Sequence, residues 1–428
     1  LRQLALSQSQ RKDAIDGIER LFASITGGYK LIVTAVYQAG VDGTPDPLLG
    51  PAINRALEQL GFSLLDSYRF YREIEPQLVA ESHQLYRLAR HNGLLGCCVD
   101  DKDQAGPPTS IATLYHTSML LSLTDPFRLA EGEVGLLFDV LVQHAESCRI
   151  IPGSDCSGSS EGVFWLDLDS DALPVPCASL QMPVAAREPY LLDATMALAA
   201  VRARLKKTPA KVRMQSPEAM VLRRLLPETM GAEKRREQRR PDGRWINLLR
   251  GVEGIHAYLT STAQQGPATA AGGRGQPVAE PADCRVLDTS DGGMKLAWES
   301  GGAGDACVGD LLGILEEQQG RELLQLGMIR SIRVYREGGL EAGVQLLPGG
   351  LGAVSCYAPE QPAEVAFRAL FMPASEAEQI AATLVVAKGF YAPDRQILID
   401  VGGREIRARA GRRVLDSPVF DRFEFSAE

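Results

Sequence analysis

The segment CRVLDTSDGGMKL, residues 284–296, is the stretch on which the fold assignment depends. Its centre, D-T-S-D-G-G at 288–293, places an acid, a hydroxyl and two glycines between two runs of strand-like residues. Asp288 and Ser290 are two positions apart, so on an extended chain both side chains point to the same face. Gly293 allows a tight turn or the close approach of a ligand. The segment therefore predicts two strands joined by a turn, with polar chemistry on one face.

A basic run precedes this segment in the chain. The stretch KRREQRRPDGRW, residues 234–245, has five basic side chains within its first seven positions. Residues 201–250 hold fifteen Lys and Arg against five Asp and Glu, although the whole chain carries a formal charge of −9. Taken alone, such a run is typical of a solvated helix end, a linker or a nucleic-acid-binding patch. Trp245 is the aromatic residue close to it, and its place in a predicted strand fits a core role as well as a stacking role.

The composition is that of a globular protein of two or three domains. The chain has 428 residues, of which 45% are hydrophobic and 23% charged. Its net negative charge argues against general nucleic-acid binding. We expect no signal peptide, and no apolar run reaches the roughly 18 residues needed to span a bilayer. Its eight cysteines include no C-x-x-C pair, so we expect free thiols, no metal site and a cytoplasmic protein.

The hydrophobic period changes along the chain from helical to alternating. In the first part, Leu49, Ile53, Leu57 and Leu60 form one apolar helical stripe, and 134–141 forms another. Only VFWLDLDSD, residues 163–171, reads there as a strand, and helices resume with YLLDATMALAAVRARL. From about residue 240, short β-type runs alternate with glycine-containing turns. A stretch rich in Gly, Ala and Pro, 260–283, is predicted to be a mobile loop.

This order predicts an α+β protein with its helices and strands in separate domains. We expect an antiparallel helical domain over 1–230, followed by β-structure to the end of the sequence. No internal period defines a repeat.

No catalytic arrangement emerges from the sequence. The G-x-S-x-G at 158–162 lacks the strand before the serine and the helix after it that a hydrolase nucleophile requires. The five histidines share no metal-ligand spacing, and no nucleophile is paired with a base. We therefore expect a protein that is not an enzyme.

Together, the two motifs resemble the PilZ family of bacterial cyclic di-GMP receptors. That family has R-x-x-x-R before the first strand of a β-barrel and [DN]-x-S-x-x-G at the second strand. Arg235-x-x-x-Arg239 and the overlapping Arg236-x-x-x-Arg240 fit the first motif, and 288–293 fits the second. The run GVQLL at 343–347 resembles the closing strand of the family. The helical part, including VFWLDLDSD, and the C-terminal FDRFEF resemble a group of larger PilZ proteins.

The resemblance implies a β-barrel over 231–358, with a β-rich extension over 359–428 that packs on it. It also implies a receptor for cyclic di-GMP that needs no cofactor. Arginine forks suit its phosphates and its guanine O6 and N7, whereas an aspartate accepts hydrogen bonds from a guanine Watson–Crick edge. The helical domain is expected to present a surface to an unidentified protein partner, and a homo-oligomer is compatible with the sequence. The doubled arginine hints at a stacked pair of ligands. The residues expected to bind the ligand are Arg235, Arg236, Arg239, Arg240, Asp288, Ser290, Gly292 and Gly293.

The spacing of the motifs departs from the family pattern. Arg239 and Asp288 are 49 residues apart, farther than in the simplest members, and 260–283 accounts for the excess. An insertion of this kind could cover the site, so a second interpretation is a PilZ-like scaffold that has lost its ligand and acts through protein contacts. A third is an RNA- or DNA-binding module, whose affinity would fall steeply with salt.

Overall fold

The computed structural model divides the chain into two compact units, 1–234 and 235–428. The first unit is mostly helical and the second is built of antiparallel strands, which confirms the predicted α+β class with the helices first. The structure describes residues 8–39, 46–100, 108–153, 161–177, 189–213, 215–226, 238–264, 282–299, 306–318, 321–336, 338–359, 366–374 and 381–428. Most of the predicted loop at 260–283, and residues 158–160 of the G-x-S-x-G match, lie outside these ranges.

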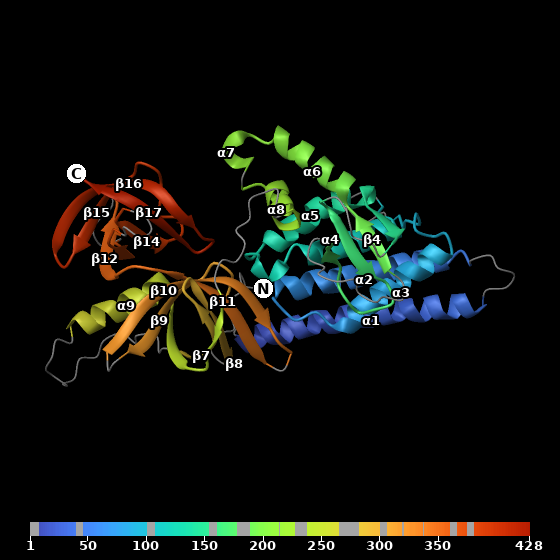
Figure 1. Ribbon diagram of the computed structural model, residues 1–428, viewed down its shortest axis with the longest axis horizontal. Helices are drawn as coiled ribbons and strands as arrows, with labels where there is room; N and C mark the ends of the chain where they lie inside the picture. The colour runs from blue at the N-terminus through green and yellow to red at the C-terminus, as the bar shows by residue number, and fades with distance from the viewer. Residues whose placement is uncertain are drawn as a thin grey trace. The chain divides into compact units, whose positions relative to one another are not determined.

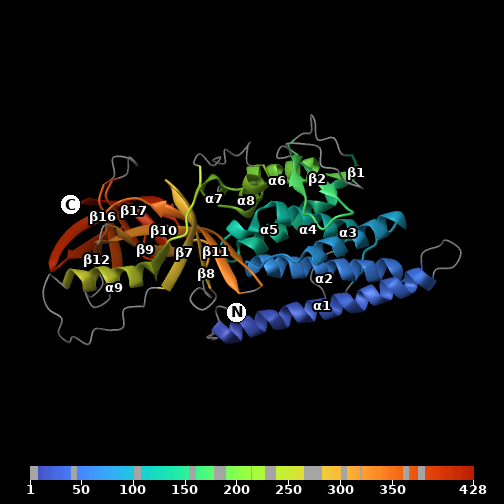
Figure 2. The ribbon, with the colours of Figure 1, turned by 60° about the horizontal axis from the view of Figure 1, so that its bottom comes forward.

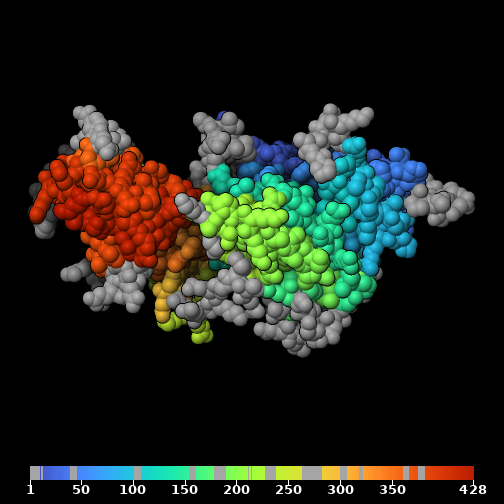
Figure 3. All heavy atoms as spheres, turned by 90° about the horizontal axis from the view of Figure 1, so that it is seen from above, coloured from blue at the N-terminus to red at the C-terminus, as the bar shows by residue number. Residues whose placement is uncertain are grey.

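The first unit is a stack of antiparallel helices. The long α1 lies alongside α2, and α3, α4 and α5 lie on the side of α2 away from α1 (Figures 1 and 2). Seen from above, the light-green residues of α6, α7 and α8 cover one face of this unit (Figure 3). The helices are α1 Gln8–Ala39, α2 Leu49–Arg69, α3 Pro76–His91, α4 Ile111–Leu123, α5 Glu133–His144, α6 Thr195–Lys207, α7 Ala210–Arg213 and α8 Pro217–Leu225, with 3-10 turns η1 Pro126–Arg128 and η2 Ala145–Ser147.

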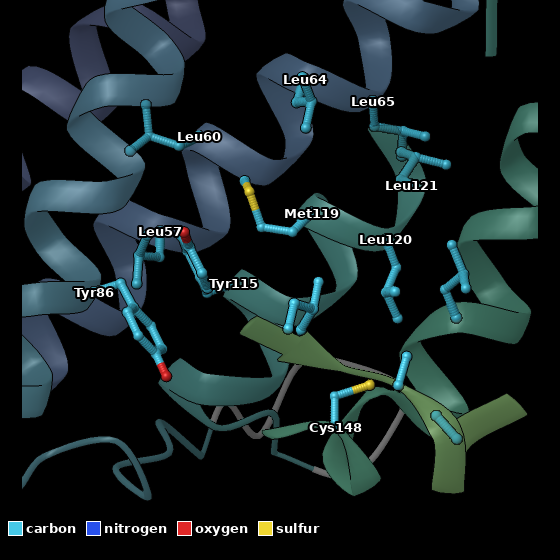
Figure 4. Close-up of a cluster of buried hydrophobic side chains, with 14 of the residues drawn as sticks. Leu57, Leu60, Leu64, Leu65, Tyr86, Tyr115, Met119, Leu120, Leu121 and Cys148 are labelled. Carbon is cyan, nitrogen blue, oxygen red and sulfur yellow. The ribbon is translucent and has the colours of Figure 1, made fainter. Parts of the chain in front are cut away.

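The core of this unit lies where α2 meets α4. The predicted stripe of α2 is buried, as is the predicted apolar face of α5, so both predictions are confirmed. Figure 4 shows leucines of α2 lying across from Met119 and Tyr115 of α4. Tyr115 stacks on Tyr86 of α3 at 4.2 Å and its hydroxyl hydrogen-bonds His83 Nδ1 at 2.6 Å. His83 is thus a buried histidine whose two ring nitrogens both have hydrogen-bond partners.

A small sheet in this unit differs from the prediction. VFWLD forms strand β2 as expected, but YLLD, predicted to be helical, forms strand β4. Asp193 Oδ1 accepts hydrogen bonds from both the backbone N–H and the hydroxyl of Thr195, so α6 begins only there. The sheet runs β1-β4-β2-β3, and its pairs join distant parts of the chain. Its strands are β1 Arg149–Pro152, β2 Val163–Asp167, β3 Val175–Pro176 and β4 Pro189–Asp193.

The second unit begins with an antiparallel barrel. Its seven-stranded sheet runs β5-β7-β6-β9-β10-β11-β8, and an additional β7–β8 pairing closes six of the strands into a ring. Helix α9 follows β6, and the alternating pattern did not predict it. It includes residues 260–264, so the expectation of a loop is wrong for these residues. The elements are β5 Arg240–Pro241, β6 Trp245–Arg250, α9 Gly251–Gln264, β7 Ala282–Ser290, β8 Gly293–Glu299, β9 Leu311–Gln318, β10 Arg321–Val334 and β11 Gly339–Leu347.

The β-rich C-terminal extension is a closed barrel of its own. Its strands run β12-β13-β14-β17-β16-β15, and β15 pairs with β12 to complete the ring. Inward-facing apolar side chains fill its centre, including Phe423 and Ile397. The strands are β12 Gly352–Tyr357, β13 Phe367–Met372, β14 Thr383–Ala387, β15 Gln396–Val401, β16 Arg404–Asp416 and β17 Phe420–Ala427.

The two barrels share a hydrophobic core. Leu249 and Leu311 of the first barrel pack in one cluster with Leu370 and Phe420 of the second. Helix α9 contacts both, lying against β6 and β9 on one side and β12 and β13 on the other (Figures 1 and 2). The hydroxyl of Ser417 also donates to the Gly309 carbonyl across the contact, at 2.6 Å. These contacts join the barrels into one body.

Of the seven cysteines in the described part of the chain, six follow the prediction. Cys97, Cys98, Cys148, Cys284, Cys307 and Cys356 are free thiols. Cys177 is disulfide-bonded, so the expectation of free thiols throughout is wrong there. A disulfide is uncommon in a reducing compartment.

Within the described residues, no helix is long and apolar enough to cross a membrane.

The shared core predicts that the two barrels unfold together. Phe420→Ala removes a buried ring from this core and should cost about 3–5 kcal/mol of stability. The expected result is an earlier unfolding transition of Trp298, which lies in the first barrel, measured by fluorescence in denaturant with Trp165 and Trp245 replaced by Phe. Val401→Ala, at an exposed position of the second barrel, is the control. A Trp298 transition that stayed in place would mean that the barrels unfold independently.

Candidate functional site

The second motif forms the hairpin between β7 and β8. Asp288 and Ser290 lie on β7, a two-residue loop follows, and Gly293 opens β8. Ser290 pairs with Gly293 across the hairpin, and its hydroxyl donates to the Gly293 carbonyl at 3.3 Å. Asp288 pairs with Lys295. The predicted strand–turn–strand unit is therefore confirmed.

A β-bulge decides which way Asp288 points. Cys284 and Val286 are buried inside the barrel, so strict alternation would place Asp288 inside as well. The register of β7 against β8 shifts between Val286 and Asp288, which adds Leu287 to the strand. A bulge of this kind re-aims the side chains beyond it. Asp288 is consequently outside the core, with 23% of its side chain exposed.

Arg239 lies directly against Asp288. Its Nη1 donates to Asp288 Oδ1 at 2.7 Å and to Oδ2 at 3.1 Å, across 49 residues of sequence. The short strand β5 sets this position, because Arg240 pairs with Thr289 and Pro241 pairs with Asp288. The structure thus brings Arg239, Arg240, Asp288 and Ser290 to one part of the barrel. Arg235 and Arg236 lie outside the described residues.

A tight turn between β5 and β6 holds the bulge in place. The backbone N–H of Asp242 donates to the carbonyl of Leu287, the extra residue of β7, at 2.9 Å. The Asp242 carboxylate accepts hydrogen bonds from the backbone N–H groups of Arg244 and Gly243, which lower its pKa. Arg244 reaches on to Glu316 of β9 at 3.0 Å. The turn, the bulge and the arginine strand therefore form one hydrogen-bonded arrangement.

The glycines of the motif allow β11 to approach closely. A Cβ added at Gly293 would lie 2.5 Å from the carbonyl oxygen of Val344, so no side chain fits there. The carbonyl of Gly292 accepts a hydrogen bond from the N–H of Leu346 at 3.0 Å. This close packing of the backbone against a neighbouring strand differs from both roles considered for Gly293, a tight turn and the approach of a ligand.

Lys295 is a cation in this region that the sequence motifs did not single out. Lys295, cross-strand from Asp288, forms an ion pair of 2.6 Å with Glu341 of β11. Burial opposes the ionisation of Glu341, but hydrogen bonds from Lys295 and Tyr335 outweigh it and lower the pKa of this carboxyl. The position of Lys295 could have indicated it from the sequence, because it lies two residues beyond Gly293 and therefore on the same face of β8.

Two further observations bear on the nature of the site. Trp245 is 70% exposed on β6, so the core role considered for it is wrong. Within the described part of the chain, no group of three or more His, Cys, Asp or Glu is placed to hold a metal ion. The chemistry at the hairpin is therefore that of arginine, carboxylate and hydroxyl groups.

Replacing Gly293 should disturb the barrel where the motif lies. In Gly293→Ala the methyl group would meet the Val344 carbonyl, and we expect a loss of roughly 1–3 kcal/mol in unfolding free energy. Chemical denaturation followed by circular dichroism measures this loss. Gly339→Ala is the matched control, because that glycine of β11 has open space around its Cβ position. Equal stability of the two variants would contradict the close-packing role.

Comparisons with known proteins match the two ends of the chain. Residues 1–153 match the family model of the N-terminal domain of the cyclic-di-GMP receptor FimW, and residues 353–427 match that of the FimW C-terminal β-barrel domain. The cyclic-di-GMP receptor FimW of Pseudomonas aeruginosa is 23% identical, and the alignment covers 94% of this chain and 76% of the relative.

Both motifs lie between the two matched segments, at 235–240 and 288–293. These matches name FimW and not PilZ, and they indicate no enzyme family. The similarities accordingly support a place for this chain in a family of cyclic-di-GMP receptors.

Proposed function

We propose that this protein is a non-catalytic receptor that binds cyclic di-GMP between its arginine segment and the β7–β8 hairpin. The observation that carries this proposal is the contact of Arg239 with Asp288, one residue from each motif, at 2.7 Å. The similarity to the cyclic-di-GMP receptor FimW supports the ligand class. The PilZ assignment of 231–358 rests on the motifs and on the closed ring of strands.

The chemistry of the pair suits this ligand. Arg239 would bind a phosphate or the O6 and N7 edge of guanine, and Asp288 would accept hydrogen bonds from a guanine Watson–Crick edge. Ser290 would satisfy a further polar group. The two side chains neutralise each other, with 37% of Arg239 and 23% of Asp288 exposed. Exposed ion pairs contribute only about 0–1 kcal/mol, so a ligand can readily replace this one.

Transmission of binding would run through the arginine segment. The division between the two units falls between Lys234 and Arg235, directly at this segment. Ligand contacts to arginines at the junction would change how the helical unit and the barrels are held relative to each other. The helical unit would then present a surface to a protein partner. The C-terminal barrel would move together with the first barrel, because the two share a core.

Calorimetry with cyclic di-GMP tests the ligand and its site. We expect micromolar or tighter binding to the parent protein and at least tenfold weaker binding to Arg239→Ala and Asp288→Ala, because each removes a polar contact to the ligand. Arg404→Ala, at an exposed arginine of the second barrel, should bind like the parent. The heats also give the stoichiometry, which distinguishes one ligand from a stacked pair.

The opposite outcomes have definite meanings. No binding by the folded parent would favour a scaffold that acts through protein contacts alone. Binding that falls steeply with salt and does not prefer a guanine dinucleotide would favour the nucleic-acid interpretation.

Small-angle scattering tests the transmission. We expect the scattering profile of the parent to change when cyclic di-GMP saturates it, because the ligand contacts arginines at the junction of the two units. Under the same conditions, the profile of Arg239→Ala should stay unchanged. An unchanged parent profile at full occupancy would contradict the switch while leaving the receptor proposal intact.

A further inference from the structure

The indole of Trp245 is exposed on the outer face of the first barrel. It is 70% accessible, whereas Trp165 and Trp298 are only 5% and 9% accessible. Its neighbour Ile246 is buried, as expected where strand residues alternate between core and surface. Tryptophan is enriched at binding interfaces, and an exposed indole offers a flat face on which a nucleotide base can stack.

An arginine lies directly beside this ring. Trp245 of β6 pairs with Arg285 of β7, and Arg285 pairs in turn with Ala297 of β8. Side chains in such cross-strand pairs are neighbours on one face of the sheet. Arg285 is exposed, and Ala297, which has a small side chain, pairs further with Glu341 of β11. Trp245 and Arg285 thus place an aromatic face and a guanidinium side by side on the outer surface.

This pair is adjacent to the candidate site. Arg285 and Asp288 are three positions apart on β7, which corresponds to roughly 10 Å along an extended strand. On β8, Ala297 and Lys295 are two positions apart and therefore lie on the same face of the strand. The bulge at Leu287 turns Asp288 toward the same outer surface. A ligand with two bases, held at Asp288 by one of them, has a second base to place within this distance.

We propose that Trp245 and Arg285 form a stacking platform for one guanine base of the cyclic dinucleotide. The base would lie on the indole, and the guanidinium of Arg285 would donate to guanine O6 and N7. Neither residue belongs to R-x-x-x-R or to the 288–293 motif. This inference rests on the proposed function and adds to it the position of the second base.

The position of the tryptophan gives a direct test. We expect cyclic di-GMP to bind Trp245→Leu at least tenfold more weakly than the parent, a loss of about 1.4 kcal/mol. Trp245→Tyr retains an aromatic face and should recover most of the affinity. Arg285→Lys retains the charge but loses the fork, and should also weaken binding. Leu323→Ala, at an exposed apolar position of β10 in the same barrel, is the control and should bind like the parent.

Fluorescence provides a readout that does not depend on affinity. With Trp165 and Trp298 replaced by Phe, acrylamide should quench the remaining Trp245 strongly without ligand and weakly at saturation. Calorimetric binding by the parent, together with unchanged affinity in Trp245→Leu and unchanged quenching, would overturn the platform and leave the receptor proposal standing. Trp245 would then remain available to a protein partner. Absence of binding by the parent would instead overturn both proposals.

Discussion

The register shift at Leu287 is the feature on which the geometry of the site depends. Strict alternation would carry Asp288 into the barrel beside Cys284 and Val286, where a carboxylate without a partner is costly. The extra residue turns it outward to meet Arg239. The turn at Asp242 stabilises the shift through its hydrogen bond to the Leu287 carbonyl. The outward direction of Asp288 therefore depends on the pairing of β5, β7 and β8 with one another.

A second constraint lies on the other side of the hairpin, where β11 approaches Gly293 too closely for any side chain. The first barrel in turn shares its core with the second, through residues such as Leu249 and Phe420. Strand β5 thus belongs to a body of two barrels that share one core. Under the proposed function, a shared core of this kind would favour transmission of ligand binding to the junction at Arg235, because little of the change would be absorbed inside the barrels.

The sequence pattern correctly predicted the class of the fold and the strand–turn–strand unit at 288–293. The helical stripe of α2 and the strands flanking 288–293 are governed by local periodicity, so the pattern of residues is enough to predict them. Helix α9, strand β4 and the outward face of Trp245 were not predicted. Each depends on packing against residues far away in the sequence, as where β4 pairs with β1 and β2. Local propensity is a weak guide where such pairing overrides it.

Residue type and spacing are enough to show that arginine, carboxylate, hydroxyl and glycine residues stand in the order of the two motifs, whereas a guanine dinucleotide as the ligand is what their resemblance to the PilZ family implies. They are also enough to show that helices precede strands. The contact of Arg239 with Asp288 across 49 residues, and the outward direction of Asp288, depend instead on the tertiary structure. An alternating pattern indicates which residues share a face of a strand, whereas only the pairing of strands shows where a β-bulge interrupts the alternation.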